Sequence, residues 1–175
     1  LAVWTRMTGA CAAMRPEPHA NFDQRIRFDG VTILQGQETV ICNSVDDALA
    51  RIRAKPTGRL LVRGSNGSGK SSLLVALKAR LASQAYYWPT GDKLAFAFAG
   101  AANDDDVEPA TSGFSSGERQ LKSLQEIVNR THAAVYLLDE WDANLDAKNR
   151  ASAEALVAQL AARAIVVEIS HRDRV

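Results

Sequence analysis

The chain has 175 residues, of which 46% are hydrophobic and 23% are charged, a composition typical of one globular domain with a sizeable core. Its formal net charge is +1, so the overall charge favours neither nucleic acid nor an anionic membrane surface as the main partner. The two cysteines, Cys11 and Cys42, have no metal-ligand spacing and are too few for a disulfide framework, which indicates a reducing compartment. No apolar run approaches the roughly 18 residues of a membrane-spanning helix, so we expect this chain to be soluble.

The first part of the chain predicts a linker followed by a strand pair and a short helix. Residues 1–24 show no clean hydrophobic period, and because the chain begins with Leu1 rather than Met we expect them to link to a preceding region of a longer polypeptide. The stretch IRFDGVTIL, a turn and then ETVICN predict two strands. Ser44, with Asp47 as a capping partner, predicts the start of a helix over SVDDALARIRA.

A glycine-rich loop follows the short apolar run RLLVR, which predicts a buried strand. The loop, GSNGSGKSS, fits the phosphate-binding pattern GxxxxGK[ST], and leucines at helical spacing after it predict a helix. In such a unit the backbone amides and the positive end of the helix dipole face phosphate oxygens. Lys70 would reach the β- and γ-phosphates, and the Ser71 hydroxyl would bind Mg²⁺. The expected nucleotide-binding residues in the loop are Gly64, Ser65, Asn66, Gly67, Ser68, Gly69, Lys70, Ser71 and Ser72.

An acidic pair, Asp139 and Glu140, follows a second buried strand predicted over residues 134–138. Asp139 can hold Mg²⁺ together with Ser71, and Glu140 can take a proton from an attacking water. Both predicted strands would end at the same sheet edge, where ligands of open α/β sheets bind.

The segment FSSGERQ, between these two motifs, predicts the start of a helix. Ser115 and Glu118 form a capping box, so we expect the helix to begin near Ser116. The exposed N-terminus of this helix would be a second anion-binding site.

The order of these motifs resembles the nucleotide-binding domain of ATP-binding cassette (ABC) proteins. FSSGE resembles the signature motif of that family, WDANLD resembles its D-loop, and His171, after the predicted strand IVVEIS, resembles its switch histidine. The resemblance covers residues 26–175. It implies an α/β P-loop NTPase fold, an ABC-type ATPase domain over residues 25–175 with a shortened helical subdomain and Q-loop region at residues 84–113.

In this family two domains pack head to tail and sandwich ATP between the phosphate loop of one and the signature helix of the other. The resemblance therefore implies ATP and Mg²⁺ as cofactors, a second copy of the domain as partner, and a transmembrane partner in the same polypeptide, at the cytoplasmic face of the membrane. Glu140 and His171 would be catalytic. The signature residues acting in trans would be Ser115, Ser116, Gly117 and Glu118, and the D-loop residues would be Asp142, Asn144 and Asp146.

The chain departs from the family pattern at three places. Leu34 or Gln35 stands where the family carries an adenine-stacking aromatic residue, and residues 89–90 stand where the Q-loop glutamine is expected. In the signature, Ser116 replaces a glycine and Glu118 replaces the glutamine, which adds a negative charge near the partner's nucleotide.

Two roles are open for the aromatic side chains in and near the Q-loop region. Core burial is the commoner fate of such side chains, and the alternative is a patch that docks a transmembrane partner. The residues in question are Tyr86, Tyr87, Trp88, Phe96 and Phe98.

The resemblance favours the ATP-hydrolysing motor domain of a membrane transporter, an exporter whose membrane helices precede Leu1. An ATPase of chromosome maintenance or repair is a second hypothesis, but such chains need long coiled-coil heptads, and none is found between the motifs. A regulator that binds ATP without hydrolysing it is a third, motivated by the missing aromatic and glutamine. A GTPase is disfavoured because no [NT]KxD string follows the phosphate loop.

Overall fold

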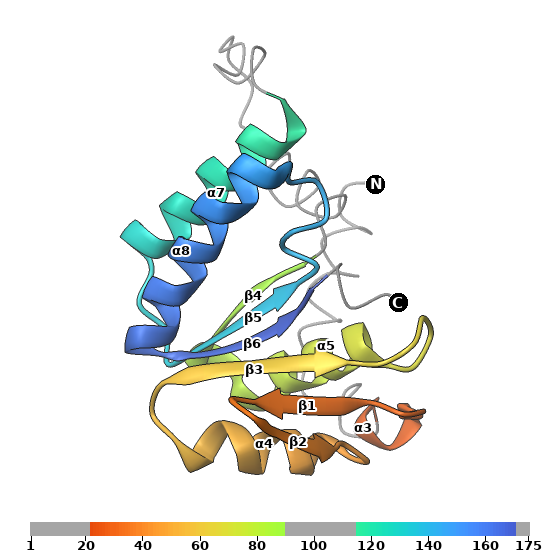
Figure 1. The fold of residues 1–175 in the computed structure, drawn as a ribbon. Helices are drawn as coiled ribbons and strands as arrows, with labels where there is room; N and C mark the ends of the chain where they lie inside the picture. Colours follow the sequence, from red (N-terminus) through yellow and green to blue (C-terminus); the bar gives the residue numbers. More distant parts are fainter. Residues whose placement is uncertain (1–21, 90–114, 171–175) are drawn as a thin grey trace, which may run out of the picture.

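The computed structural model describes residues 22–89 and 115–170, which form an α/β fold around a mixed six-stranded sheet (Figure 1). In spatial order the strands are β2 (Glu38–Ile41), β1 (Thr32–Gln35), β3 (Gly58–Arg63), β6 (Ile165–Ile169), β5 (Val135–Asp139) and β4 (Ala85–Trp88). β1 pairs antiparallel with β2 and β3, whereas β3, β6, β5 and β4 are parallel. The helices are α3 (Phe22–Arg25), α4 (Val45–Ala54), α5 (Lys70–Leu81), α7 (Ser116–Arg130) and α8 (Ala147–Arg163), with a 3₁₀ turn, η1 (Ala82–Gln84), after α5.

The sheet separates two hydrophobic cores because side chains alternate across each strand. On one face, Val135 and Leu137 of β5 belong to the core that includes α4 and α5. On the other face, Tyr136 and Leu138 pack with α7 and α8, which lie side by side in Figure 1. Every residue of β5 and of β6 is buried, as expected for central parallel strands covered by helices on both sides.

Most of the elements predicted from the sequence are confirmed. The strand pair, the strand before the glycine-rich loop, the helix after it and the strand before the acidic pair are all present. Capping boxes form as expected, by Ser44 with Asp47 on α4 and by Ser115 with Glu118 on α7. The α/β class is therefore correct.

Three described elements lie where the sequence analysis expected none. α8 fills the interval between the acidic loop and β6, and Asp146 caps it by accepting a hydrogen bond from the Asn149 N–H at 2.8 Å. β4 occupies the first residues of the region expected to be a helical subdomain, 84–113. The expected linker end at residue 24 lies inside α3, whose Phe22 packs against the core. Phe96 and Phe98 lie outside the described residues.

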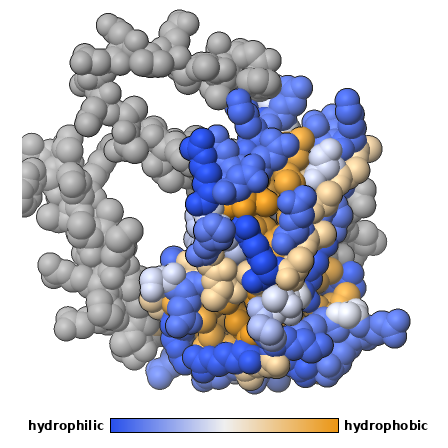
Figure 2. Space-filling model, turned by 90° about the vertical axis from the view of Figure 1, so that its left-hand side faces the viewer, coloured by the Kyte–Doolittle hydropathy of each residue, from blue (hydrophilic) through white to orange (hydrophobic). Residues whose placement is uncertain are grey.

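None of the helices within residues 22–89 and 115–170 is long and apolar enough to cross a bilayer. Figure 2 shows the side of the molecule at the left of Figure 1, where hydrophilic residues dominate and hydrophobic residues form smaller areas between them. The Trp88 side chain is 2% exposed, and Tyr86 and Tyr87 are half-buried against the two cores. These three aromatic residues therefore serve the core, as the commoner reading predicts.

A partly buried cluster of one arginine and two acids joins β3, β6 and α8. Arg59 donates two hydrogen bonds to the Glu168 carboxylate, at 2.7 and 2.9 Å, and a third to Glu154 on α8. Glu168 is 4% exposed; burial raises the pKa of its carboxyl group, and the hydrogen bonds from Arg59 oppose that rise. Burying the Glu168 carboxyl group between sheet and helix costs free energy, and the two hydrogen bonds from Arg59 offset part of this cost.

We expect Arg59→Met to lower the free energy of unfolding by about 2–3 kcal/mol, because it leaves the Glu168 carboxyl buried without its partner. This is less than for a fully buried pair, since the Arg59 side chain is 31% exposed. The double variant Arg59→Met/Glu168→Leu should recover most of the loss, as measured by urea denaturation. A double variant no more stable than Arg59→Met would contradict this account.

Candidate functional site

The glycine-rich loop leaves the carboxyl end of β3 and leads directly into α5. Gly69, the N-cap of α5, has a φ of 98°, which side-chain-bearing residues rarely adopt. A Cβ there would lie 2.9 Å from the carbonyl oxygen of Arg27, so the position requires glycine on steric grounds as well. The Asp29 N–H also donates to the Ser68 carbonyl at 3.3 Å, so the segment before β1 supports the outer side of the loop.

Lys70 folds back across this loop. Its Nζ donates to the carbonyl oxygens of Gly64 at 2.6 Å and Ser65 at 2.8 Å. These two bonds hold the ammonium group over the loop. A phosphate oxygen bound in the loop could replace one of the two carbonyl oxygens as its hydrogen-bond acceptor. The loop thus forms one concave surface that carries the Lys70 ammonium group.

Ser71 and Asp139 meet at the end of the sheet. The Ser71 Oγ donates to Asp139 Oδ1 at 3.3 Å, although 68 positions separate the two residues. Asp139 is the last residue of β5 and is 3% exposed. Burial, together with the nearby charge of Asp139, raises the pKa of Tyr87 on β4 to about 12, so Tyr87 stays neutral near the acid. The two oxygen donors expected to hold Mg²⁺ are therefore brought together.

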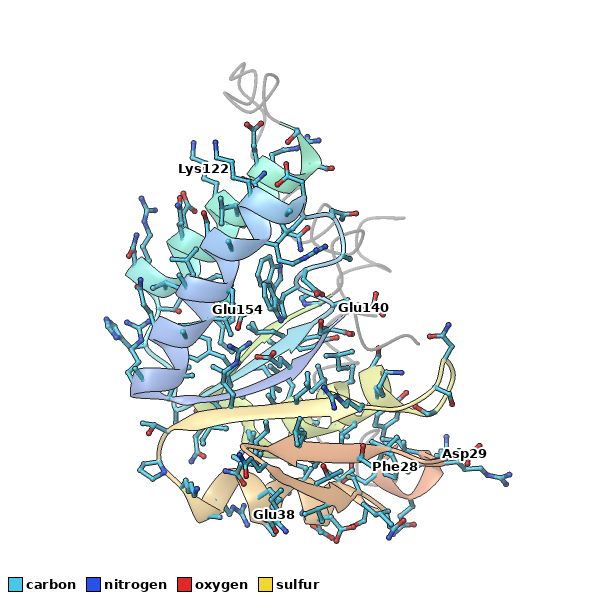
Figure 3. The ribbon with its side chains drawn as sticks, viewed as in Figure 1. Phe28, Asp29, Glu38, Lys122, Glu140 and Glu154 are labelled. Atoms are coloured by element: carbon cyan, nitrogen blue, oxygen red, sulfur yellow. The ribbon has the colours of Figure 1, made fainter. Side chains whose placement is uncertain are left out.

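Glu140 lies beside the same loop. It follows β5 with a φ of 51°, and its N–H donates to the carbonyl oxygen of Ile169 at 2.8 Å. Figure 3 shows Glu140 where the parallel strands end, whereas Lys122 on α7 extends from a distant part of the surface. A pocket of about 230 Å³ is lined by Asn66, Gly67, Gly69, Lys70, Ser71, Ser72 and Glu140. The loop, the lysine and the second acid thus share one pocket, as the sequence analysis expected.

The residues of the signature-like segment lie elsewhere. Ser115, Ser116 and Glu118 are exposed at the N-terminus of α7, and none of them lines the pocket. The Glu118 carboxylate accepts a hydrogen bond from the Ser115 N–H at 2.8 Å, so this charged group lies against the N-terminus of its own helix. Gly117 is buried against the loop after Glu140, where a Cβ would lie 2.8 Å from the carbonyl oxygen of Asn144.

The loop over residues 141–146 connects the acidic pair to both helices of this face. Trp141 and Leu145 are buried in the core with α7 and α8. Gln120 of α7 donates through Nε2 to the carbonyl oxygen of Trp141, a contact that sequence reasoning missed. The signal in the sequence that this loop packs against a helix was the tryptophan directly after the two acids, because so large an apolar side chain is usually buried.

Of the D-loop residues, Asp142 is buried, Asn144 is exposed and Asp146 is the exposed N-cap of α8. The Asp142 carboxyl accepts a hydrogen bond from the Ser170 Oγ at 2.7 Å, and this contact was also missed. The expected switch histidine, His171, lies outside the described residues, and so does residue 90 of the expected Q-loop position.

No protein-family model and no curated protein matches this chain. Within residues 22–89 and 115–170 there is no group of three or more His, Cys, Asp or Glu side chains placed to hold a metal. Ser71 and Asp139 place two oxygen-bearing side chains together, and Mg²⁺ in many sites is held by one or two such side chains together with substrate phosphates.

Gly117→Ala should lower the free energy of unfolding by about 1–3 kcal/mol, because the added methyl group forces α7 away from the Asn144 carbonyl. Ser116→Ala, one position earlier and exposed, serves as the control and should change stability by about 0.5 kcal/mol or less. Urea denaturation of both variants measures the difference. Equal stability of the two variants would show that the close approach at Gly117 is not a constraint.

Proposed function

We propose that this chain is the ATP-binding and ATP-hydrolysing domain of an ABC membrane transporter, an exporter, working as a head-to-tail dimer at the cytoplasmic face of the membrane. The observation that carries the proposal is the convergence of Lys70, Ser71, Asp139 and Glu140 around the loop after β3. These residues meet at the carboxyl edge of the parallel strands, where open α/β sheets bind their ligands.

The residues fit a magnesium triphosphate. Lys70 presents an ammonium group to the β- and γ-phosphates, and the loop amides with the N-terminus of α5 supply further donors. Ser71 and Asp139 would hold Mg²⁺ through oxygen, which this ion prefers. When bound, the ion would neutralise charge that develops on the phosphate oxygens.

Glu140 would act as the general base. Its place on the wall of the phosphate pocket lets its carboxylate accept a proton from the water that attacks the γ-phosphorus, while the bond to the leaving ADP oxygen breaks. Lys70 and the loop amides stabilise the charge that moves onto that oxygen. In the family that the sequence resembles, His171 would orient the γ-phosphate.

The position of α7 supports a dimer. Ser115 and Ser116 are exposed at its N-terminus and do not line the pocket of their own chain, so they are available to the nucleotide of a second copy. The amide groups at this helix end would then complete the second half of an ATP sandwich. Membrane helices joined to the chain would move when the two copies close on ATP and separate after hydrolysis.

Lys70→Ala should weaken magnesium-ATP binding by at least about 10²-fold, because it removes the ammonium group that faces the β- and γ-phosphates. Equilibrium titration with a fluorescent ATP analogue measures the affinity. Lys122→Ala, which removes an exposed lysine of α7 far from the pocket, is the matched control and should bind like the unaltered protein. Retained affinity in Lys70→Ala would exclude this loop as the nucleotide site.

Glu140→Gln should slow ATP hydrolysis by roughly 10²-fold or more while leaving ATP affinity intact, because it removes the base but not the phosphate cradle. Phosphate release and nucleotide titration give the two quantities, and Glu126→Gln on α7 is the control with the same change in charge. With hydrolysis blocked, magnesium ATP should also shift the protein to a dimer in light scattering. Unchanged turnover would reject the role of Glu140, and a monomer at saturating ATP would reject the sandwich.

A further inference from the structure

The turn that follows Glu140 holds this residue in an unusual backbone conformation. The Ala143 N–H donates to the Glu140 carbonyl oxygen at 3.2 Å, which closes a turn with Trp141 and Asp142 at its centre. The φ of 51° at Glu140 is one that residues with side chains adopt only where their surroundings hold it. The contacts of this turn therefore decide where the Glu140 carboxyl group points.

Ile169, the last residue of β6, and Ser170, directly after it, hold the turn. The carbonyl oxygen of Ile169 accepts the Glu140 N–H at 2.8 Å, and the next side chain, Ser170, donates through Oγ to the Asp142 carboxyl at 2.7 Å. The first bond sets the start of the turn and the second sets its middle. Between them, the Trp141 side chain is buried in the core of α7 and α8. With three successive residues anchored, the left-handed conformation of Glu140 is enforced.

The buried acid at position 142 is not explained by packing. Asp142 is 2% exposed, and burying a carboxyl group costs free energy that a hydrogen bond only partly offsets. Burial is the main cause of the raised pKa of Glu168, and the charges of Glu154 and, to a smaller extent, Asp142 also raise it. An apolar side chain would fill the same place without this unfavourable proximity of two acids. An apolar side chain could not accept the hydrogen bond that Ser170 donates to this acid.

We infer that Asp142 is a positioning residue, whose hydrogen bond to Ser170 holds the turn over residues 140–143 so that the Glu140 carboxylate faces the phosphate pocket. The inference rests on the proposed function, because it gives Asp142 a part in the hydrolysis for which Glu140 is the base. The family resemblance places Asp142 in the D-loop, and the inference adds that it acts within its own chain, through the main chain of its own general base.

Steady-state hydrolysis of magnesium ATP by Asp142→Ala, Asp142→Asn and Ser170→Ala tests the inference. Asp142→Ala should lower kcat about tenfold or more and change KM less than about threefold, because the base is misplaced while the phosphate loop is untouched. Asp142→Asn keeps an acceptor oxygen for Ser170 and should retain most of the activity. Ser170→Ala should reduce kcat in the same direction, which keeps the test decisive if Asp142→Ala fails to fold.

Two further measurements separate positioning from loss of stability. In a Glu140→Gln background, adding Asp142→Ala should lower the residual rate less than about twofold, since there is no base left to misplace. Hydrogen exchange should show faster exchange at the Glu140 amide in Asp142→Ala than in Asp142→Asn. Asp47→Ala, which removes a capping residue of the distant α4, is the control for destabilisation and should leave kcat unchanged.

The outcomes distinguish this inference from the proposed function. An unaltered protein that neither binds nor hydrolyses ATP would overturn the proposed function and this inference with it. Hydrolysis by the unaltered protein with an unchanged kcat in Ser170→Ala and Asp142→Ala would overturn this inference alone. A further large loss when Asp142→Ala is added to Glu140→Gln would do the same, because it would show that Asp142 does not act through Glu140.

Discussion

The site depends on one long-range contact, the hydrogen bond between Ser71 at the start of α5 and Asp139 at the end of β5. β3 and β5 are not neighbours in the sheet, because β6 lies between them and pairs in parallel with both. This arrangement directs both strands toward the same edge, so that the loop after β3 and the acids after β5 face each other. The cores that cover the two faces of the sheet fix the strands in this register, and the register places the contact.

The turn after β5 contacts elements on both sides of it, and the position of the proposed site depends on these contacts. Through Glu140 and Asp142 it contacts the end of β6 and Ser170 directly after that strand, and it contacts α7 through Trp141. α7 carries the exposed signature-like residues Ser115, Ser116 and Glu118 at its N-terminus, where Gly117 lets the helix approach the same loop closely. This one loop therefore supports both Glu140, which would act on the chain's own nucleotide, and α7, whose N-terminus would contact the nucleotide of a partner. A residue with a side chain at position 117 would disturb both halves of the proposed sandwich.

Sequence reasoning predicted the elements whose local chemistry is strong. The capping boxes on α4 and α7 were found because a serine and an acid three residues apart satisfy the backbone of a helix start in a way that is visible in sequence. α8 was missed because alanines surround its few larger apolar positions and blur the hydrophobic stripe. β4 was missed because a four-residue strand at the edge of the sheet has no period of its own to reveal it.

The sequence by itself determined the chemical groups and their local settings: the glycine-rich loop with Lys70 and Ser71, the acidic pair after an apolar strand, and the capped start of α7. These follow from interactions between residues a few positions apart, which a linear pattern records. Only the tertiary structure decided that Ser71 meets Asp139, that Trp141 accepts a bond from Gln120, and that Asp142 is buried against Ser170. The partners in these contacts lie between 21 and 68 positions apart, and the order of strands in the sheet, which no local pattern encodes, brings them together.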